Sequence, residues 1–243
     1  KSGEYQIEPH ESPARILGRV SRGDIYQHRI TLLEGWSYQD LIGKLRQQTK
    51  LSQKLASLTP GQFREQLSLT ASSPEGLFFP DTYFFIRGES DLDLLDRAAR
   101  KMEQILKEVW ALRASDITLD TSYQALILAS IIQKEAMRSS EMPRISAVFH
   151  NRLKRKMRLQ ADPTVIYGLG DALKGRLKRS HLKQDNPYNT YTRAGLTPGP
   201  ISMPSRAALE AAVRPLTTQE LYFVAKGDGT HQFSNTLKEH NAA

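Results

Sequence analysis

Glu135 is the residue of this sequence whose position best suits acid–base chemistry. It follows Leu128, Ile131 and Ile132 by seven, four and three residues, so these side chains share one face of a helix predicted from about Ser122 to Met137. An apolar face is buried, and a carboxyl group there loses hydration, which raises its pKa. A carboxylic acid that holds its proton near neutral pH can act as a general acid. On its own, the helix pattern favours the plainer alternative, in which the glutamate ends the apolar stripe at the surface and pairs with a lysine.

No spacing between acidic residues in the sequence identifies a second catalytic carboxyl group. Glu141, Asp162 and Asp171 are candidates, but none stands at a spacing that declares a two-carboxylate glycosidase pair. The six histidines have no metal-ligand spacing and the chain has no cysteine. We therefore expect no metal and no cofactor.

Two polar segments rich in amides, hydroxyls and aromatic rings follow Glu135. They span residues 158–164 and 186–191. Amides and hydroxyls bond sugar hydroxyls and N-acetyl groups, while aromatic rings cover the apolar face of a sugar. The same residue types also satisfy ordinary turns, so composition leaves a sugar site and plain loop chemistry equally open.

The composition is that of an ordinary globular protein with a basic balance. Lys and Arg number 34 against 26 Asp and Glu, which gives a net charge of +8. An excess of this kind suits a polyanionic partner such as nucleic acid, anionic lipid or an anionic wall polymer. The densest basic stretch, residues 152–158, also fits a solvated helix end. No nucleic-acid-binding signature is present, and no apolar run approaches the ~20 residues of a membrane span.

The predicted elements indicate an α+β protein with a boundary in the polar stretch 60–75. Residues 1–72 read as a small strand–helix–strand–helix module, with strands expected at 5–7 and 28–33. Residues 73–243 read as a mixed helical domain that ends in a β-hairpin over 221–233. Its helices are expected at 91–110, 122–137, from 143 onward, and 205–213.

Six linked segments resemble the YceG-like family of endolytic murein transglycosylases, in order and over most of residues 75–241. They are EGLFFPDTY at 75–83, LASIIQKE at 128–135, FHNRL at 149–153, MRLQADPTVIYG at 157–168, YNTYTRAGLTPGP at 188–200 and YFVAKGDGTHQF at 222–233.

The resemblance implies that Glu135 is the catalytic glutamate. It would cleave the bond between N-acetylmuramic acid and N-acetylglucosamine and leave 1,6-anhydro ends. The residues expected to hold the sugar are Gln160, Asp162, Tyr167, Tyr188, Asn189, Thr190 and Tyr191, and all except Tyr167 lie in the two polar segments.

The resemblance also implies a setting for the enzyme. Residues 1–72 would be the later part of a LysM-like module. A single span before Lys1 would anchor the protein in the inner membrane, with the catalytic part in the periplasm. The expected partners are peptidoglycan glycan strands and penicillin-binding synthases, not nucleic acid.

One residue departs from the family pattern. Gln133 stands where the family has the first glutamate of its "EKE" segment, and helix geometry turns it about 200° from Glu135. We interpret Gln133 as structural. The alternatives are a hydrolase that uses Asp162 as a second carboxylate, and a wall-binding scaffold without activity.

Overall fold

Side-chain caps set the start of most helices in this protein. The side chains of Ser12, Ser37, Ser90, Thr121 and Ser205 each accept an N–H of the first turn that has no partner within the helix. The helices are α1 Pro13–Arg22, α2 Tyr38–Arg46, α3 Pro60–Gln66, α4 Asp91–Ala111, α5 Ser122–Glu135, α6 Met142–Lys154, α7 Asp162–Leu169, α8 Arg179–Leu182, α9 Arg206–Val213 and α10 Leu237–Ala242.

The computed structural model describes residues 3–243 and is mainly helical, with two antiparallel two-stranded sheets. The strands are β1 His28–Thr31, β2 Thr82–Phe85, β3 Tyr222–Ala225 and β4 His231–Ser234. This confirms the α+β class and the C-terminal hairpin. The expected strand at 5–7 is wrong, because residues 4–8 form no regular secondary structure.

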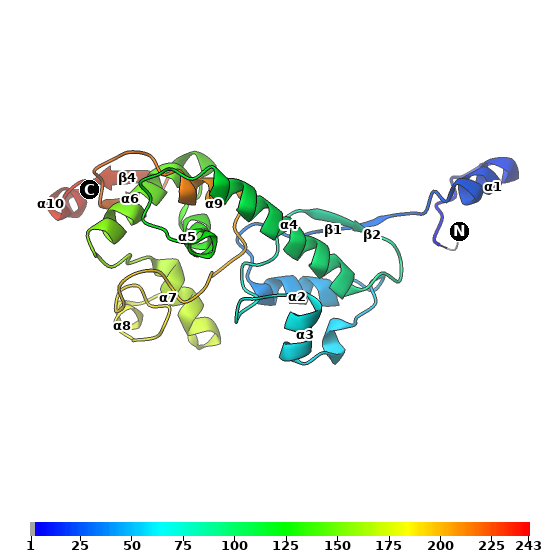
Figure 1. The fold of residues 1–243 in the computed structure, drawn as a ribbon, viewed down its shortest axis with the longest axis horizontal. Coiled ribbons are helices and arrows are strands. Elements are labelled where there is room, and N and C mark those ends of the chain that lie inside the picture. Colours follow the sequence, from blue (N-terminus) through cyan, green and yellow to red (C-terminus); the bar gives the residue numbers. More distant parts are fainter. Residues whose placement is uncertain (1–2) are drawn as a thin grey trace.

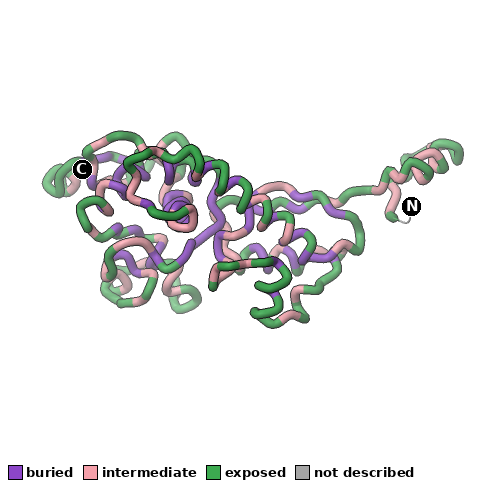
Figure 2. The backbone as a smooth tube through the Cα atoms, viewed as in Figure 1, coloured by how far each residue is buried: buried purple, intermediate pink, exposed green. Residues whose placement is uncertain are grey.

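Two lobes share the long helix α4 (Figure 1). The first lobe contains α2, α3 and the β1–β2 sheet, in which His28 lies opposite Phe85. The second lobe is built around α5, which packs against α4, α6 and α9. Helix α1 projects away from both lobes and has no buried residue (Figures 1 and 2).

The core of the first lobe continues beyond residue 72. Phe78, Leu94 and Met203 are buried in the same cluster as Ile30 and Leu41. A cut between residues 72 and 73 would separate β1 from β2 and expose this core. The two lobes therefore do not follow the boundary at residue 72 that the sequence predicted. That boundary remains a prediction about how function is divided along the chain.

Main-chain atoms join the lobes next to the end of α5. The N–H of Gly35 donates to the Met203 carbonyl at 2.8 Å, and the N–H of Met203 donates to the Trp36 carbonyl at 2.8 Å. Gly35 has a φ of 76°, a conformation that favours glycine. The Lys134 ammonium donates to the Gly35 carbonyl at 3.3 Å. The junction thus lies one residue from Glu135.

Candidate active site

Glu135 is the last residue of α5, and its surroundings favour the protonated acid. The side chain is half-buried. Burial raises its pKa to about 8, the negative charge of Asp162 acts in the same direction, and the Arg152 guanidinium opposes them. A helix C-terminus also disfavours a negative charge. Glu135 is therefore protonated at neutral pH and able to donate a proton.

The burial of Glu135 does not come from an amphipathic face. Residues 125–132 of α5 are all buried, so the helix is enclosed on every side in the second lobe. The stripe of Leu128, Ile131 and Ile132 is buried as predicted, but it does not single out the direction of Glu135. What distinguishes this carboxyl group is its place at the end of an enclosed helix.

Asp162 lies near Glu135 but in an environment that suits a negative charge. It is the first residue of α7, where the helix dipole stabilises an anion. The Tyr191 hydroxyl donates to its Oδ1 at 2.6 Å. Burial and the charges of Asp162 and Glu135 raise the pKa of Tyr191, so this hydroxyl stays protonated. The site thus holds one acidic proton donor and one carboxylate anion.

Arg152 is a cationic neighbour that sequence reasoning did not identify as part of the site. Its side chain is buried, with Nε donating to the Leu221 carbonyl at 2.6 Å and one terminal nitrogen donating to the Leu159 carbonyl at 2.7 Å. Its guanidinium lies 5.2 Å from the centre of the Tyr222 ring. In the sequence, Arg152 is one of several basic residues in the stretch 152–158. Only its place in the segment FHNRL distinguishes it from the others.

Asn189 and Thr190 build the loop that holds Tyr191, and their polar atoms bond within the protein. The Asn189 amide donates to the carbonyls of Leu182 at 3.2 Å and Gln184 at 2.7 Å, and accepts the Tyr191 N–H at 2.8 Å. The Thr190 hydroxyl accepts the Ala161 N–H at 3.0 Å. Both residues are buried, so they position other groups of the site.

Gln160 remains available to a ligand. Its side chain is exposed, and its backbone has a φ of 50°, which is uncommon for a residue with a Cβ. The Gln160 N–H donates to the Thr190 carbonyl at 3.2 Å. Gln160 stands two residues before Asp162, so its exposed side chain is close in sequence to that carboxylate.

Tyr167 and Tyr188 form a second cluster around another buried carboxyl group, Glu75. Their rings lie 4.8 Å apart, and the Tyr167 hydroxyl donates to Glu75 Oε2 at 3.2 Å. The Tyr38 N–H at the start of α2 donates to Glu75 Oε1 at 3.0 Å. Burial raises the pKa of Glu75. Glu75, which sequence reasoning did not identify, thereby links α2 of the first lobe to α7 of the second.

Gln133 points to a different neighbour from Glu135. Its Oε1 accepts the Ser205 N–H at 2.9 Å, beside the start of α9. Its Cγ also lies close to the position a Cβ on Gly35 would take, at 3.8 Å. These contacts agree with a structural role at the junction of the lobes.

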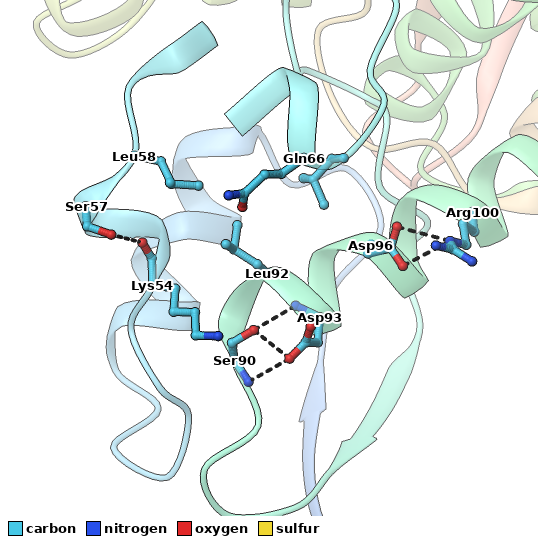
Figure 3. A pocket seen from close by; sticks show the side chains of 10 residues that line it. Lys54, Ser57, Leu58, Gln66, Ser90, Leu92, Asp93, Asp96 and Arg100 are labelled. Carbon is cyan, nitrogen blue, oxygen red and sulfur yellow. Dashed lines mark hydrogen bonds and ion pairs between the residues drawn. The ribbon is translucent and has the colours of Figure 1, made fainter. Parts of the chain in front are cut away.

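A large surface hollow lies elsewhere, in the first lobe. It measures about 560 Å³ and opens between α3 and the start of α4, where Ser90 caps α4 and Arg100 pairs with Asp96 (Figure 3). None of the candidate site residues lines it. Its two carboxylates, Asp93 and Asp96, are already bonded to Ser90 and Arg100, so we do not assign the reaction to it.

Residues 3–243 lack two further features, a metal-binding cluster of side chains and a membrane-spanning helix. No group of three or more His, Asp or Glu side chains in this range is arranged to hold a metal ion. No helix in this range combines the length and the apolar character needed to cross a membrane.

Known proteins resemble the chain over its whole length. The profile of the YceG-like family matches residues 1–243. A Bacillus subtilis protein named endolytic murein transglycosylase is 34% identical over 260 residues, covering 100% of this chain and 72% of the relative. A protein of the same name from Streptococcus pneumoniae is 27% identical over 277 residues, covering 99% of this chain and 49% of the relative.

The fold also matches a solved structure. A 2.6 Å crystal structure of a YceG-like protein from Listeria monocytogenes superposes with a TM-score of 0.75 at 29% identity, covering 98% of this chain and 83% of that chain. A two-lobed helical protein with a protonated glutamate beside an aspartate is suited to glycoside cleavage. The chain belongs to the YceG-like family.

Proposed function

We propose that this protein is an endolytic murein transglycosylase in which Glu135 serves as both acid and base. The enzyme class rests on the relatives of that name, the first of which is 34% identical over the full chain. The observation that supports Glu135 is its pKa of about 8, which keeps the proton on a half-buried carboxyl group at neutral pH.

The reaction needs one proton that is given and later recovered. Glu135 donates its proton to the glycosidic oxygen between N-acetylmuramic acid and N-acetylglucosamine, and the C1–O bond breaks with its electrons passing to that oxygen. The muramic ring becomes oxocarbenium-like. The Glu135 carboxylate then takes the proton of the 6-hydroxyl, and O6 bonds to C1. The product carries a 1,6-anhydro end, no water is consumed, and Glu135 regains its proton.

The neighbours of Glu135 suit this order of reaction steps. The Asp162 carboxylate, held by the Tyr191 hydroxyl at 2.6 Å, supplies a negative charge near the cationic transition state. The buried Arg152 guanidinium favours the ionised Glu135 that forms after the first proton transfer. We assign the exposed Gln160 amide to bond a sugar substituent.

Product analysis in heavy-oxygen water tests the mechanism. Digestion of purified sacculi in H₂¹⁸O should give 1,6-anhydromuramic ends without label, measured by mass spectrometry. Glu135→Gln should reduce the rate by about 10²–10⁴ because the amide cannot donate the proton. Near-normal cleavage by this variant in a folded state would refute the assignment.

A hydrolase is the second candidate, and the position of Asp162 favours it. A carboxylate beside a protonated acid can activate water instead of leaving the 6-hydroxyl to react. Reducing ends that carry ¹⁸O would support this alternative.

The wider setting is also a proposal. As a cell-wall enzyme, the protein would act on glycan strands at the outer face of the cytoplasmic membrane, beside a penicillin-binding synthase. Residues 1–72 would act as a LysM-like binding module. Fractionation and cross-linking in cells that carry the full-length gene would test both statements.

A further inference from the structure

The net positive charge of this protein is concentrated in one segment. Residues 152–193 hold 11 of the 34 Lys and Arg but only 3 of the 26 Asp and Glu, and the rest of the chain holds 23 of each. The excess of +8 therefore resides in 42 residues. They run from the end of α6 through α7 and α8 to the loop that carries Tyr191 (Figure 1).

Eight basic residues of this segment are exposed and have no ion-pair partner, and five of them lie around α8. No carboxylate in the described part of the chain lies within ion-pair distance of them, whereas Arg193 in the same segment pairs with Asp185 at 2.9 Å. The five around α8 lie within ten residues and are Lys174, Arg176, Lys178, Arg179 and Lys183. We call these five residues the basic rim.

The basic rim is attached directly to the loop of the active site. The Asn189 amide holds the Leu182 and Gln184 carbonyls, which flank Lys183. Two residues beyond Asn189, the Tyr191 hydroxyl bonds Asp162, whose charge acts on Glu135. A polymer that enters the site thus passes near unpaired cations.

We propose that the basic rim binds the carboxylates of the peptide stems on the glycan strand, an inference that rests on the proposed function. Every muramic unit bears a peptide on its lactyl group, and the peptide ends and side chains of these stems carry carboxylates. A strand held at Glu135 therefore presents a row of anions on both sides of the cleaved bond. Several mobile cations suit anions at variable positions, and their attraction weakens with salt.

Sedimentation of the protein with sacculi tests this proposal without requiring cleavage. The rim variant combines K174Q, R176Q, K178Q, R179Q and K183Q on a Glu135→Gln background. The matched control combines R29Q, R64Q, K107Q, K226Q and K238Q, which removes five exposed charges without an ion-pair partner from other parts of the chain. Each protein is assayed on sacculi and on the same material stripped of peptides by an amidase.

The rim variant should bind peptide-bearing sacculi about tenfold more weakly than its parent at ~0.05 M salt, with little difference by ~0.5 M salt. On stripped strands the two should bind nearly alike, and the control should follow the parent on both materials. Three results would overturn the proposal: equal losses in the rim and control variants, an undiminished loss on stripped strands, or a loss that disappears only when phosphate-bearing wall polymer is extracted.

Failure of the proposed function would give a different experimental result from failure of the basic rim. Wild-type protein that makes no 1,6-anhydro product from sacculi would refute the lytic reaction whatever the binding assay gives. Wild-type protein that makes this product, together with a rim variant that binds peptide-bearing sacculi as tightly as its parent, would refute the basic rim alone.

Discussion

Glu135→Gln should make the protein more stable at neutral pH as well as inactive. In the folded protein the pKa of Glu135 is about 8, against an ordinary value of 4.5. Between these two values the unfolded chain loses this proton and the folded chain keeps it. Wild-type stability therefore falls by at most about 1.4 kcal/mol per pH unit as the pH rises through this window, and levels off above pH 8.

The amide of the variant does not titrate, so its advantage should grow with pH. It should be close to zero at pH 4, about 3 kcal/mol at pH 7 and at most about 5 kcal/mol above pH 8. Urea unfolding followed by circular dichroism at pH 4, 5.5, 7 and 8.5 gives this difference directly. Glu65→Gln, which removes an exposed carboxyl group, controls for the change in net charge. A difference that stays constant with pH would refute the buried, protonated state of Glu135.

Three other substitutions test neighbours of the site. Asp162→Asn removes a charge that raises the pKa of Glu135, so the alkaline limb of the kcat/KM profile should move to lower pH; an unmoved limb would contradict the coupling. Gln133→Ala deprives the Ser205 N–H of its acceptor, so it should lower the free energy of unfolding by about 1 kcal/mol while specific activity is retained. Gln133→Glu should keep the same products. Loss of activity in folded Gln133→Ala would place this residue in the site. Glu75→Ala leaves the Tyr38 N–H and the Tyr167 hydroxyl without an acceptor, so it should lower the free energy of unfolding by about 2 kcal/mol or more. Glu75→Gln should have a smaller effect. Equal stability of the wild type and both variants would refute the link between the lobes.

The sequence predicted the elements whose signals are local. Helices were expected at 91–110, 122–137 and 205–213, and α4, α5 and α9 lie there. The hairpin expected over 221–233 is formed by β3 and β4. Helix α7 was missed because its start carries a proline and no side-chain cap. Proline suits the first turn of a helix as well as a loop, so its presence did not decide between them.

The composition of the site was predictable only in part. Helical spacing together with the family resemblance indicated Glu135, and the polar segments indicated Asp162 and Tyr191; the roles of these residues remain predictions. The contact of Asp162 with Tyr191, and that of Glu75 with Tyr167, joins residues 29 and 92 positions apart, which no local pattern determines. Asn189 has the residue type of a sugar ligand, yet its amide holds backbone carbonyls, because buried main-chain groups compete for the same donors.

The paired backbone hydrogen bonds between Gly35, Trp36 and Met203 bear on how this architecture tolerates sequence drift. A bond between main-chain atoms is kept when side chains change, so most substitutions at Trp36 or Met203 leave these two links available. Gly35 is the exception, since its φ of 76° strains any residue with a Cβ. Random mutagenesis of this junction should therefore tolerate more residues at position 36 than at position 35, whereas position 203, whose side chain is buried in the core of the first lobe, should accept apolar residues only. An arrangement of this kind allows the two lobes to keep their geometry beside Glu135 while the surrounding sequence diverges.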